Sequence, residues 1–372
     1  CASVRLAVAR ALGRFVGAMP ATPVLAVSGG CLLGGCLLLL RMSRPRTAET
    51  PLARMKQAFL VEGNTDIASA KIEVHEVDVP TPKSGQVLVR VAAAPINPSD
   101  DGIWKDARIK TATPIGIECS GSVVATGGGL YANHLLGKKV AVVGGGVYAE
   151  YVVADAFKSA YTLPEHLPVE MGCAFFVNPF TAVGILESVR EAGGKVFIHT
   201  AGASQLGQML AKLCLHEGVT LVSVVRRPEQ KDLLVKLGCD ERHVVVTGAG
   251  EPGSWKERLQ ALIKELKIKH AFDAIAGEMS GDLLALLPGG GCLWVYGRLS
   301  DQAISNVQPL DLIYRGKKIQ GFMVATWMMK DGPLKGLRRS IKVASIVRKY
   351  LDSVFASDFV DVSLEEMHAR YC

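Results

Sequence analysis

The sequence predicts an α/β protein in which a β-rich domain precedes a domain built on a doubly wound parallel sheet. Short Val-rich runs alternate with Gly, Pro and Asn turns from Lys56 to Val153, a pattern typical of an all-β module. From about Phe175, buried apolar runs alternate with amphipathic helices, which is the βαβ pattern of a parallel sheet. The length of 372 residues accommodates two domains, and 49% hydrophobic with 21% charged residues is a globular composition.

The first 54 residues differ in composition from the rest of the chain. They contain seven Arg and one acid, which is six of the seven net positive charges, so the basicity does not predict a nucleic-acid partner. Arg5, Arg10 and Arg14 lie among apolar residues at roughly helical spacing, which predicts an organellar targeting helix, with mitochondria favoured over plastids. Residues 15–40 carry no formal charge and are long enough to cross a bilayer. A retained membrane anchor and an artefact of translation or gene assignment are the alternatives.

A glycine-containing loop follows the first strand expected in the parallel sheet. The strand covers Lys195–Thr200, and the loop places Gly202, Ser204 and Gly207 at the three positions of a GxGxxG fingerprint, before an amphipathic helix. The first glycine makes the tight turn, and the last lets the helix pack close to the strand. The serine can cap the helix or donate to a phosphate oxygen. The strand–loop–helix setting therefore predicts a dinucleotide-binding loop.

The end of the second parallel strand indicates which dinucleotide is bound. Arg226 and Arg227 follow the apolar run TLVSVV, and no acid occurs before Glu229. An acid at this place would accept a hydrogen bond from the ribose of NAD, whereas cations suit the 2′-phosphate of NADPH. The sequence therefore favours NADPH, and two solvated arginines at a strand end are the alternative interpretation.

The chain resembles a known family in the order of several short motifs. These are AAPINPSD, FFVNPFTAV, the GASQLG loop, VVRR, VYG and GKKIQGFMV. Together they resemble the medium-chain dehydrogenase/reductase superfamily from about Met55 to the C-terminus, and most closely its zinc-free NADPH members, the quinone oxidoreductases and the mitochondrial 2-enoyl thioester reductases. The resemblance implies a GroES-like catalytic domain, a Rossmann cofactor domain and an active site between them. The expected segments are a leader (1–54), the GroES-like domain (55–175), the Rossmann domain (176–325) and a return to the catalytic domain (326–372).

Several site residues are expected in this arrangement. Asn97 is the candidate for polarising a substrate carbonyl through its side-chain amide, and a turn residue before Pro98 is the alternative. The resemblance and the strand–loop positions place further residues near the cofactor; these are Asn178, Thr181, Tyr296, Gly297 and Phe322. Helix-start chemistry for Asn178 and Thr181, and simple core packing for Tyr296 and Phe322, are the alternatives.

The chain also departs from the family pattern. Zinc-dependent relatives use a Cys in the loop that reads Asn97–Asp100 here, and a His where this chain has Ile117 before Glu118, so we expect no metal. Related thioester reductases carry a proton-donating tyrosine soon after the NPSD turn, but residues 101–114 contain none. The chain begins without Met and ends before the family's final strand, so we expect truncation at both ends.

These observations leave three functional hypotheses. The first is an NADPH-dependent oxidoreductase that transfers hydride to a small-molecule quinone, or to an activated C=C or C=O bond, without zinc. The second is a 2-enoyl thioester reductase of organellar fatty-acid synthesis, and the third is a non-catalytic cofactor-binding subunit of an organellar assembly. By analogy with relatives that pair through a sheet edge, we also expect a homodimer, with residues 291–305 as the exposed edge.

Overall fold

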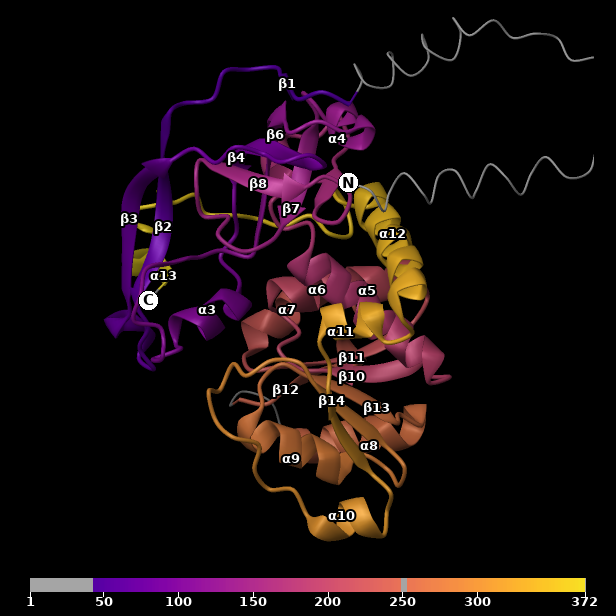
Figure 1. The fold of residues 1–372 in the computed structure, drawn as a ribbon. Coiled ribbons are helices and arrows are strands. Elements are labelled where there is room, and N and C mark those ends of the chain that lie inside the picture. Colours follow the sequence, from indigo (N-terminus) through magenta and orange to yellow (C-terminus); the bar gives the residue numbers. More distant parts are fainter. Residues whose placement is uncertain (1–42, 249–252, 372) are drawn as a thin grey trace, which may run out of the picture. The chain divides into compact units, whose positions relative to one another are not determined.

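The computed structural model describes residues 43–248 and 253–371 (Figure 1). The expected targeting helix and the apolar segment 15–40 lie outside the described residues. The chain divides into two units, residues 1–44 and residues 45–372, and the strands and helices named below belong to the second. Among the described residues, no helix has the length and apolar character needed to cross a bilayer.

The β-rich half consists of antiparallel strands in two sheets. One sheet has the order β8-β4-β6-β7-β9, with β1 also paired to β6, and the other has the order β3-β2-β5. The alternating Val residues of the central strands point into one core, in which Val87, Val89 and Val140 are fully buried. The strands are β1 (Arg46–Thr47), β2 (Arg54–Glu62), β3 (Lys71–Asp78), β4 (Gln86–Ala93), β5 (Thr113–Pro114), β6 (Glu118–Thr126), β7 (Lys139–Val143), β8 (Tyr151–Asp155) and β9 (Ala160–Thr162). Two short helices, α3 (Pro98–Trp104) and α4 (Leu130–His134), connect them.

The second half is a parallel sheet with the order β12-β11-β10-β13-β14-β15. The chain order reverses between β10 and β13, and such a reversal is where doubly wound sheets bind their ligands, at the carboxyl ends of the strands. The strands are β10 (Val196–His199), β11 (Thr220–Val225), β12 (Val244–Val246), β13 (His270–Asp273), β14 (Cys292–Val295) and β15 (Lys318–Gly321). The helices are α5 (Val177–Glu191), α6 (Gln205–His216), α7 (Pro228–Lys236), α8 (Trp255–Leu266) and α9 (Gly277–Leu286). The predicted fold class is confirmed.

One expectation about the sheet edge is wrong. Strand β14 lies between β13 and β15, so residues 291–305 do not supply an exposed edge. The short run Lys318–Gly321 lies within the motif GKKIQGFMV; it pairs in parallel with β14 and is itself the last strand. Its own burial pattern is mostly exposed, which explains why its periodicity gave no strand signal.

The C-terminal segment contacts both halves. Helix α10 (Pro309–Ile313) precedes β15, and helices α11 (Val324–Met329) and α12 (Pro333–Lys349) pack against α5. The last helix, α13 (Met367–Tyr371), returns to the β-rich half, where Met367 is buried in its core. The division into a GroES-like domain, a Rossmann domain and a return segment, with its boundaries, stays a prediction.

Candidate functional site

The glycine-containing loop lies between β10 and α6 as predicted. A Cβ atom on Gly207 would lie 2.3 Å from the carbonyl oxygen of Gly202, and one on Gly202 would lie 2.9 Å from Cβ of Ser223 on the neighbouring strand. Both positions therefore require glycine for packing alone. Ser204 is the N-cap of α6, because its Oγ accepts a hydrogen bond of 3.1 Å from the backbone N–H of Gly207. The turn brings the helix N-terminus, with its partial positive charge, to the end of the strand.

The two arginines stand at the carboxyl end of β11, next to this loop in the sheet order. Both are exposed, and neither guanidinium forms an ion pair within the described residues. Their backbone is held by Gln230, whose Oε1 accepts from the N–H groups of Arg226 (2.9 Å) and Arg227 (3.1 Å). The chain therefore fixes the backbone while leaving both cations available to a phosphate.

A buried polar cluster joins the β-rich half to the start of α5. Asn97 is 2% exposed, and its Nδ2 donates to Oε1 of Glu118 at 3.0 Å. The other carboxylate oxygen of Glu118 accepts from the backbone N–H groups of Phe176 (2.8 Å) and Val177 (3.0 Å) at the N-terminus of α5. Asn178 completes the cluster, because its Nδ2 lies 3.5 Å from Oδ1 of Asn97. The structure thus brings together Asn97 and Asn178, which the sequence predicted separately.

This arrangement limits what Asn97 can do. One hydrogen of its amide is committed to Glu118, so one hydrogen and the orientation set by Glu118 are left for a substrate oxygen. Its backbone N–H also donates to Oδ2 of Asp100 at 2.9 Å, which fixes the start of α3. The expected carbonyl-polarising role of Asn97 stays a prediction, and it would act from a position held by three neighbours.

Two carboxyl groups in this cluster have raised pKa values. Burial raises the pKa of Glu118 to about 7, although the N–H groups of Val177 and Phe176 and the Asn97 amide favour its ionised form. Burial also raises the pKa of Asp100 to about 6, against the opposing effect of the Asn97 N–H and the Tyr148 hydroxyl. The junction therefore holds two acids that change protonation near neutral pH.

At the carboxyl ends of β10 and β14, the buried His199 pairs with the partly buried Tyr296. His199 Nε2 lies 2.7 Å from the Tyr296 hydroxyl, and the two rings stack with centroids 5.7 Å apart. Burial lowers the pKa of His199 to about 3, so the imidazole is neutral at physiological pH. The hydroxyl of Tyr296 is therefore engaged inside the protein. The next residue, Gly297, is required by packing, since a Cβ there would lie 2.6 Å from the carbonyl oxygen of Ala274.

Thr181 and Phe322 are used inside the protein. The Thr181 hydroxyl donates to the carbonyl of Val177 one turn earlier in α5, at 2.6 Å. Phe322 is 9% exposed and packs edge-on against Phe272, and its ring lies so close to Gly184 that a Cβ there would be 3.0 Å away. The Thr181 contact is an i−4 hydrogen bond within the helix, since the N-cap of α5 is Phe176, and the Phe322 contact is core packing. A role of either residue toward a cofactor stays a prediction.

Several parts of the site could not be predicted from the sequence. The contact of Glu118 with the N-terminus of α5 and the pairing of His199 with Tyr296 each join residues at least 58 positions apart. Asp273, a fully buried acid at the end of β13, was not among the expected residues; it accepts from Thr200 Oγ1 at 2.7 Å and from the N–H of Ile275 at 2.9 Å. An acid ending an apolar strand was the available signal for Asp273.

The described residues contain no group of three or more His, Cys, Asp or Glu placed to hold a metal ion. The residue types at the expected ligand positions do not suit zinc: Asn97 has an amide and Ile117 an aliphatic side chain, and neither is a zinc ligand. The absence of zinc chemistry stays a prediction for the purified protein.

Comparison with known proteins identifies the family. Residues 83–165 match the model of the alcohol dehydrogenase GroES-like domain, and residues 206–334 match the model described as zinc-binding dehydrogenase. A crystal structure from Mesorhizobium loti, assigned as an NADPH:quinone reductase, is 31% identical and superposes with a TM-score of 0.71 over 82% of this chain and 90% of that one. The chain belongs to the medium-chain dehydrogenase/reductase superfamily, whose oxidoreductase fold of a GroES-like and a Rossmann domain it shares.

Two further relatives carry the names of thioester reductases. The mitochondrial enoyl-[acyl-carrier-protein] reductase of Mus musculus is 26% identical over 299 residues, which cover 78% of each chain. The heterodimeric mitochondrial 2-enoyl thioester reductase of Candida tropicalis is 18% identical, with a TM-score of 0.66 over 86% of this chain and 96% of that one, and this likeness concerns the fold alone. The predicted superfamily is confirmed, and these relatives do not single out a substrate.

Proposed function

We propose that this protein is a zinc-independent oxidoreductase that uses NADPH to reduce a quinone or another activated C=O or C=C bond. The observation that carries the proposal is the cofactor end of the parallel sheet. Its loop needs glycine at 202 and 207, and it lies beside two arginines that have no partner in the described residues. The name of the Mesorhizobium loti relative supports the same cofactor and substrate class.

The residues present fit the cofactor. The close approach of Gly207 to Gly202 leaves the backbone N–H groups of the α6 N-terminus free of bulky side chains, which suits a pyrophosphate. Arg226 and Arg227 suit the 2′-phosphate, and Gly297, which packs against the backbone of Ala274 at the carboxyl end of the sheet, has no side chain to obstruct a nicotinamide ring. When bound, the cofactor supplies a hydride.

The chain's own contribution is positioning. Asn97 offers its remaining amide hydrogen to the substrate oxygen, and Glu118 and Asn178 hold that amide in one orientation. In a quinone, the hydride supplies two electrons and one proton equivalent, and the second proton comes from water. Reduction of this kind therefore needs no tyrosine donor, which is why the missing tyrosine favours it over thioester reduction.

The test is NADPH oxidation by the full chain with three substrates: a benzoquinone, an enone and a crotonyl thioester. We expect the fastest turnover with the quinone. Turnover of the crotonyl thioester alone would instead favour a 2-enoyl thioester reductase, the activity named for the Mus musculus relative. NADPH binding without turnover of any substrate would favour the third hypothesis, a non-catalytic subunit.

We also propose a mitochondrial location, supported by the names of relatives from several animals and by the Arg-rich first residues. If residues 1–54 are a cleaved leader, the protein isolated from mitochondria begins between Arg41 and Met55. Recovery of the full-length chain in a carbonate-resistant membrane fraction would support the anchor instead.

We propose that a homodimer forms through β15 and the adjacent α10, in place of the edge first expected. Strand β15 is the last strand of its sheet, and Leu310, Ile313 and Tyr314 beside it are 63%, 68% and 79% exposed. Light scattering after size exclusion should show a dimer that Tyr314→Asp converts to a monomer. A monomeric unmodified protein would contradict the proposal.

A further inference from the structure

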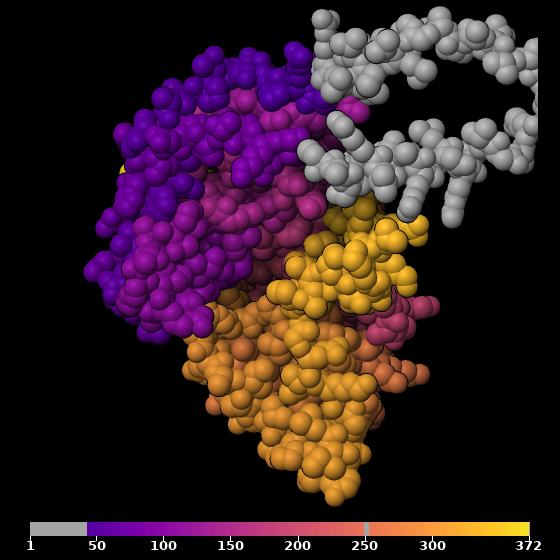
Figure 2. All heavy atoms as spheres, viewed as in Figure 1, coloured from indigo at the N-terminus to yellow at the C-terminus, as the bar shows by residue number. Residues whose placement is uncertain are grey.

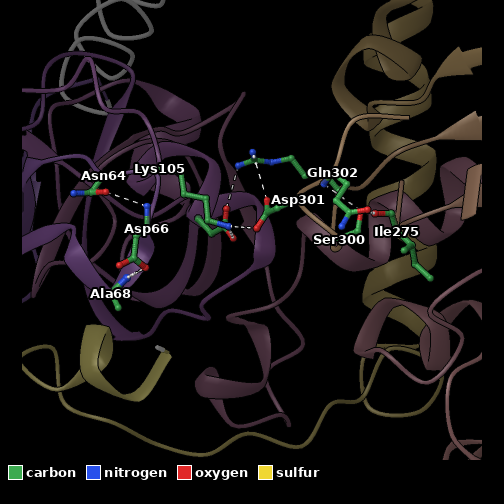
Figure 3. A network of polar contacts seen from close by, with 10 residues as sticks. Asn64, Asp66, Ala68, Lys105, Ile275, Ser300, Asp301 and Gln302 are labelled. Atoms are coloured by element: carbon green, nitrogen blue, oxygen red, sulfur yellow. Dashed lines mark hydrogen bonds and ion pairs between the residues drawn. The ribbon is translucent and has the colours of Figure 1, made fainter. Parts of the chain in front are cut away.

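Four charged residues form a closed cluster between α3 and the loop that follows β14. The Lys105 ammonium lies 2.5 Å from Asp301 and 3.1 Å from Asp101. The Arg298 guanidinium lies 3.2 Å from Asp101 and 3.8 Å from Asp301. Each cation thus contacts both acids, and we call these four residues the clasp. Figure 3 shows Lys105 of the β-rich half pointing toward Asp301 of the parallel-sheet half.

The clasp is more shielded than an ordinary surface ion pair. The side chains of Lys105 and Asp101 are 15% and 19% exposed, whereas those of Arg298 and Asp301 are about half exposed. Isolated exposed pairs contribute little, and networks of partly buried charges contribute more. Asp301 is the main cause of the raised pKa of Lys105. These observations indicate a contact that holds the two halves together at this point.

Each side of the clasp is anchored in its own half. Ser300 donates to the carbonyl of Ile275 through both its backbone N–H (2.9 Å) and its hydroxyl (2.7 Å). Asp301 has a φ of 52°, a left-handed conformation that is uncommon for a residue other than glycine. On the other side, Trp104 is fully buried, and its carbonyl accepts from the N–H of Asn64 at 3.1 Å. The loop and the helix are therefore fixed with their charges facing each other.

The clasp lies at the border of the proposed site. Helix α3 starts directly after Asn97, and Arg298 directly follows Gly297, so the clasp connects the element that would contact the substrate oxygen with the one that would line the nicotinamide. On the face drawn in Figure 2, the purple surface of the β-rich half meets the orange surface of the parallel-sheet half. A cavity of about 290 Å³ lined by Glu187, Trp327 and Arg339 lies elsewhere, between α5 and α12.

Resting on the proposed function, we propose that the clasp determines substrate size: by joining α3 to residues 298–302 it blocks this side of the site and restricts the enzyme to compact, uncharged substrates. A substrate with a long acyl chain leaving on this side would have to separate four charges. The two cations of the clasp are matched by two acids, so its net charge is zero. It therefore does not attract the phosphate groups of a carrier or coenzyme thioester. Small quinones and short enones meet both conditions.

The experiment compares substrate selectivity in the full chain and in two variants. Asp301→Ala removes one of the two acids that both cations contact, the one that belongs to the parallel-sheet half. Arg108→Ala is the matched control, because Arg108 forms an exposed ion pair of 2.7 Å with Asp106 just after α3 and does not bridge the halves. kcat/KM is measured with NADPH and a benzoquinone, and with crotonyl, octenoyl and dodecenoyl thioesters. We expect the unmodified protein to lose activity as the chain lengthens. Asp301→Ala should raise the dodecenoyl-to-crotonyl ratio by about tenfold or more, because both thioesters carry the same charges and differ only in chain length, and Arg108→Ala should leave this ratio unchanged.

The outcomes separate this inference from the proposed function. An identical chain-length profile in Asp301→Ala, or a preference of the unmodified protein for the dodecenoyl thioester, would overturn the role of the clasp while leaving the reductase activity intact. If no substrate is turned over, the proposed function fails, and calorimetric binding of the crotonyl and dodecenoyl thioesters measures the chain-length selectivity instead. Should Asp301→Ala unfold, Lys105→Met removes the contact from the other side, and a thermal unfolding curve checks that each variant is folded.

Discussion

The cofactor end of the parallel sheet and the polar cluster around Glu118 differ in how their polar side chains are used. The cofactor end depends on residues close in sequence, from Gly202 to Gly207, and presents exposed cations that have no partner in the described residues. The cluster joins residues from positions 97, 118 and 176–178, and its polar groups are buried and bonded to one another. The cofactor end has polar groups available to a ligand, whereas the polar groups around Glu118 hold one another in place. Changes in the two regions should therefore differ in kind as well as in size.

The largest expected effect is in the glycine loop. Gly207→Val would place side-chain carbons within about 2.3 Å of the Gly202 carbonyl, and backbone cannot move aside as a flexible side chain can. We expect loss of NADPH binding together with destabilisation of about 3 kcal/mol or more. Fluorescence titration with NADPH and urea unfolding measure both.

Gly218→Ala is the control for this change. Gly218 is in the same half and has a φ of 63°, but nothing lies within 4 Å of the position its Cβ would take. It should lower stability modestly through backbone strain and leave NADPH binding intact. Full NADPH affinity in Gly207→Val would show that this loop is an ordinary turn.

This contrast explains how much the sequence could predict. The GxSxxG loop and the arginines of β11 were found because a strand, a turn and a helix follow one another in the chain, and the packing demands on Gly202 and Gly207 are local. The N-cap role of Ser204 was anticipated for the same reason. The parallel strands up to β14 could be predicted because their apolar runs are continuous.

The remaining features depend on contacts between distant segments. The residues near Glu118 in the sequence do not predict that its carboxylate accepts hydrogen bonds from Phe176 and Val177, because only the fold brings β6 to the start of α5. Strand β15 was missed because its side chains are mostly exposed, so neither alternation nor an apolar run marks it. The motifs could be recognised from residue type, but the partners of each side chain could not.

The next effect concerns pH. Burial raises the pKa of Glu118 from 4.5 to about 7, so the folded state binds this proton more tightly than the unfolded chain. Its contribution to stability is fully present below about pH 4.5 and is lost as the pH rises through about 7. Relative to Glu118→Gln, which cannot ionise, the unmodified protein should lose on the order of 3 kcal/mol of unfolding free energy between these limits.

Urea unfolding at several pH values measures this difference. The subtraction matters because two other buried groups titrate in the same range: Asp100, with a pKa raised to about 6, acts in the same direction, and His199, with a pKa lowered to about 3, acts in the opposite one. Both groups are present in the unmodified protein and in the variant, so the effect of His199 cancels. Asp100 raises the pKa of Glu118 through its charge, so the difference reports Glu118 together with its coupling to Asp100. A difference that does not change with pH would mean that Glu118 stays ionised, held by its three donors.

A smaller effect, on cofactor affinity and not on stability, is expected at the two exposed arginines of the cofactor end. Arg226→Ala and Arg227→Ala should each weaken NADPH binding by roughly 10- to 100-fold, since each removes a charge-assisted contact to the 2′-phosphate. NADH lacks that phosphate, so its affinity should barely change, and neither variant should alter stability, because both side chains are exposed and unpaired in the described residues. Equal affinity of the unmodified protein for the two cofactors would make the arginines solvated surface charges.

The smallest effect is expected at Ser204. This residue belongs to the cofactor loop, but its side chain is bonded inside the protein, as the side chains around Glu118 are. Its hydroxyl accepts from the N–H of Gly207 at 3.1 Å, and replacing an N-cap serine by glycine costs only a few tenths of a kcal/mol, whereas alanine costs about 1 kcal/mol. If capping is the whole role of the serine, Ser204→Gly should keep NADPH affinity within about twofold and Ser204→Ala should lose stability more than affinity. If the hydroxyl also donates to a phosphate, both variants lose affinity to the same extent while their stabilities differ. Paired thermal unfolding and NADPH titration of the two variants decide between these roles, since stability follows the cap and affinity follows the hydroxyl.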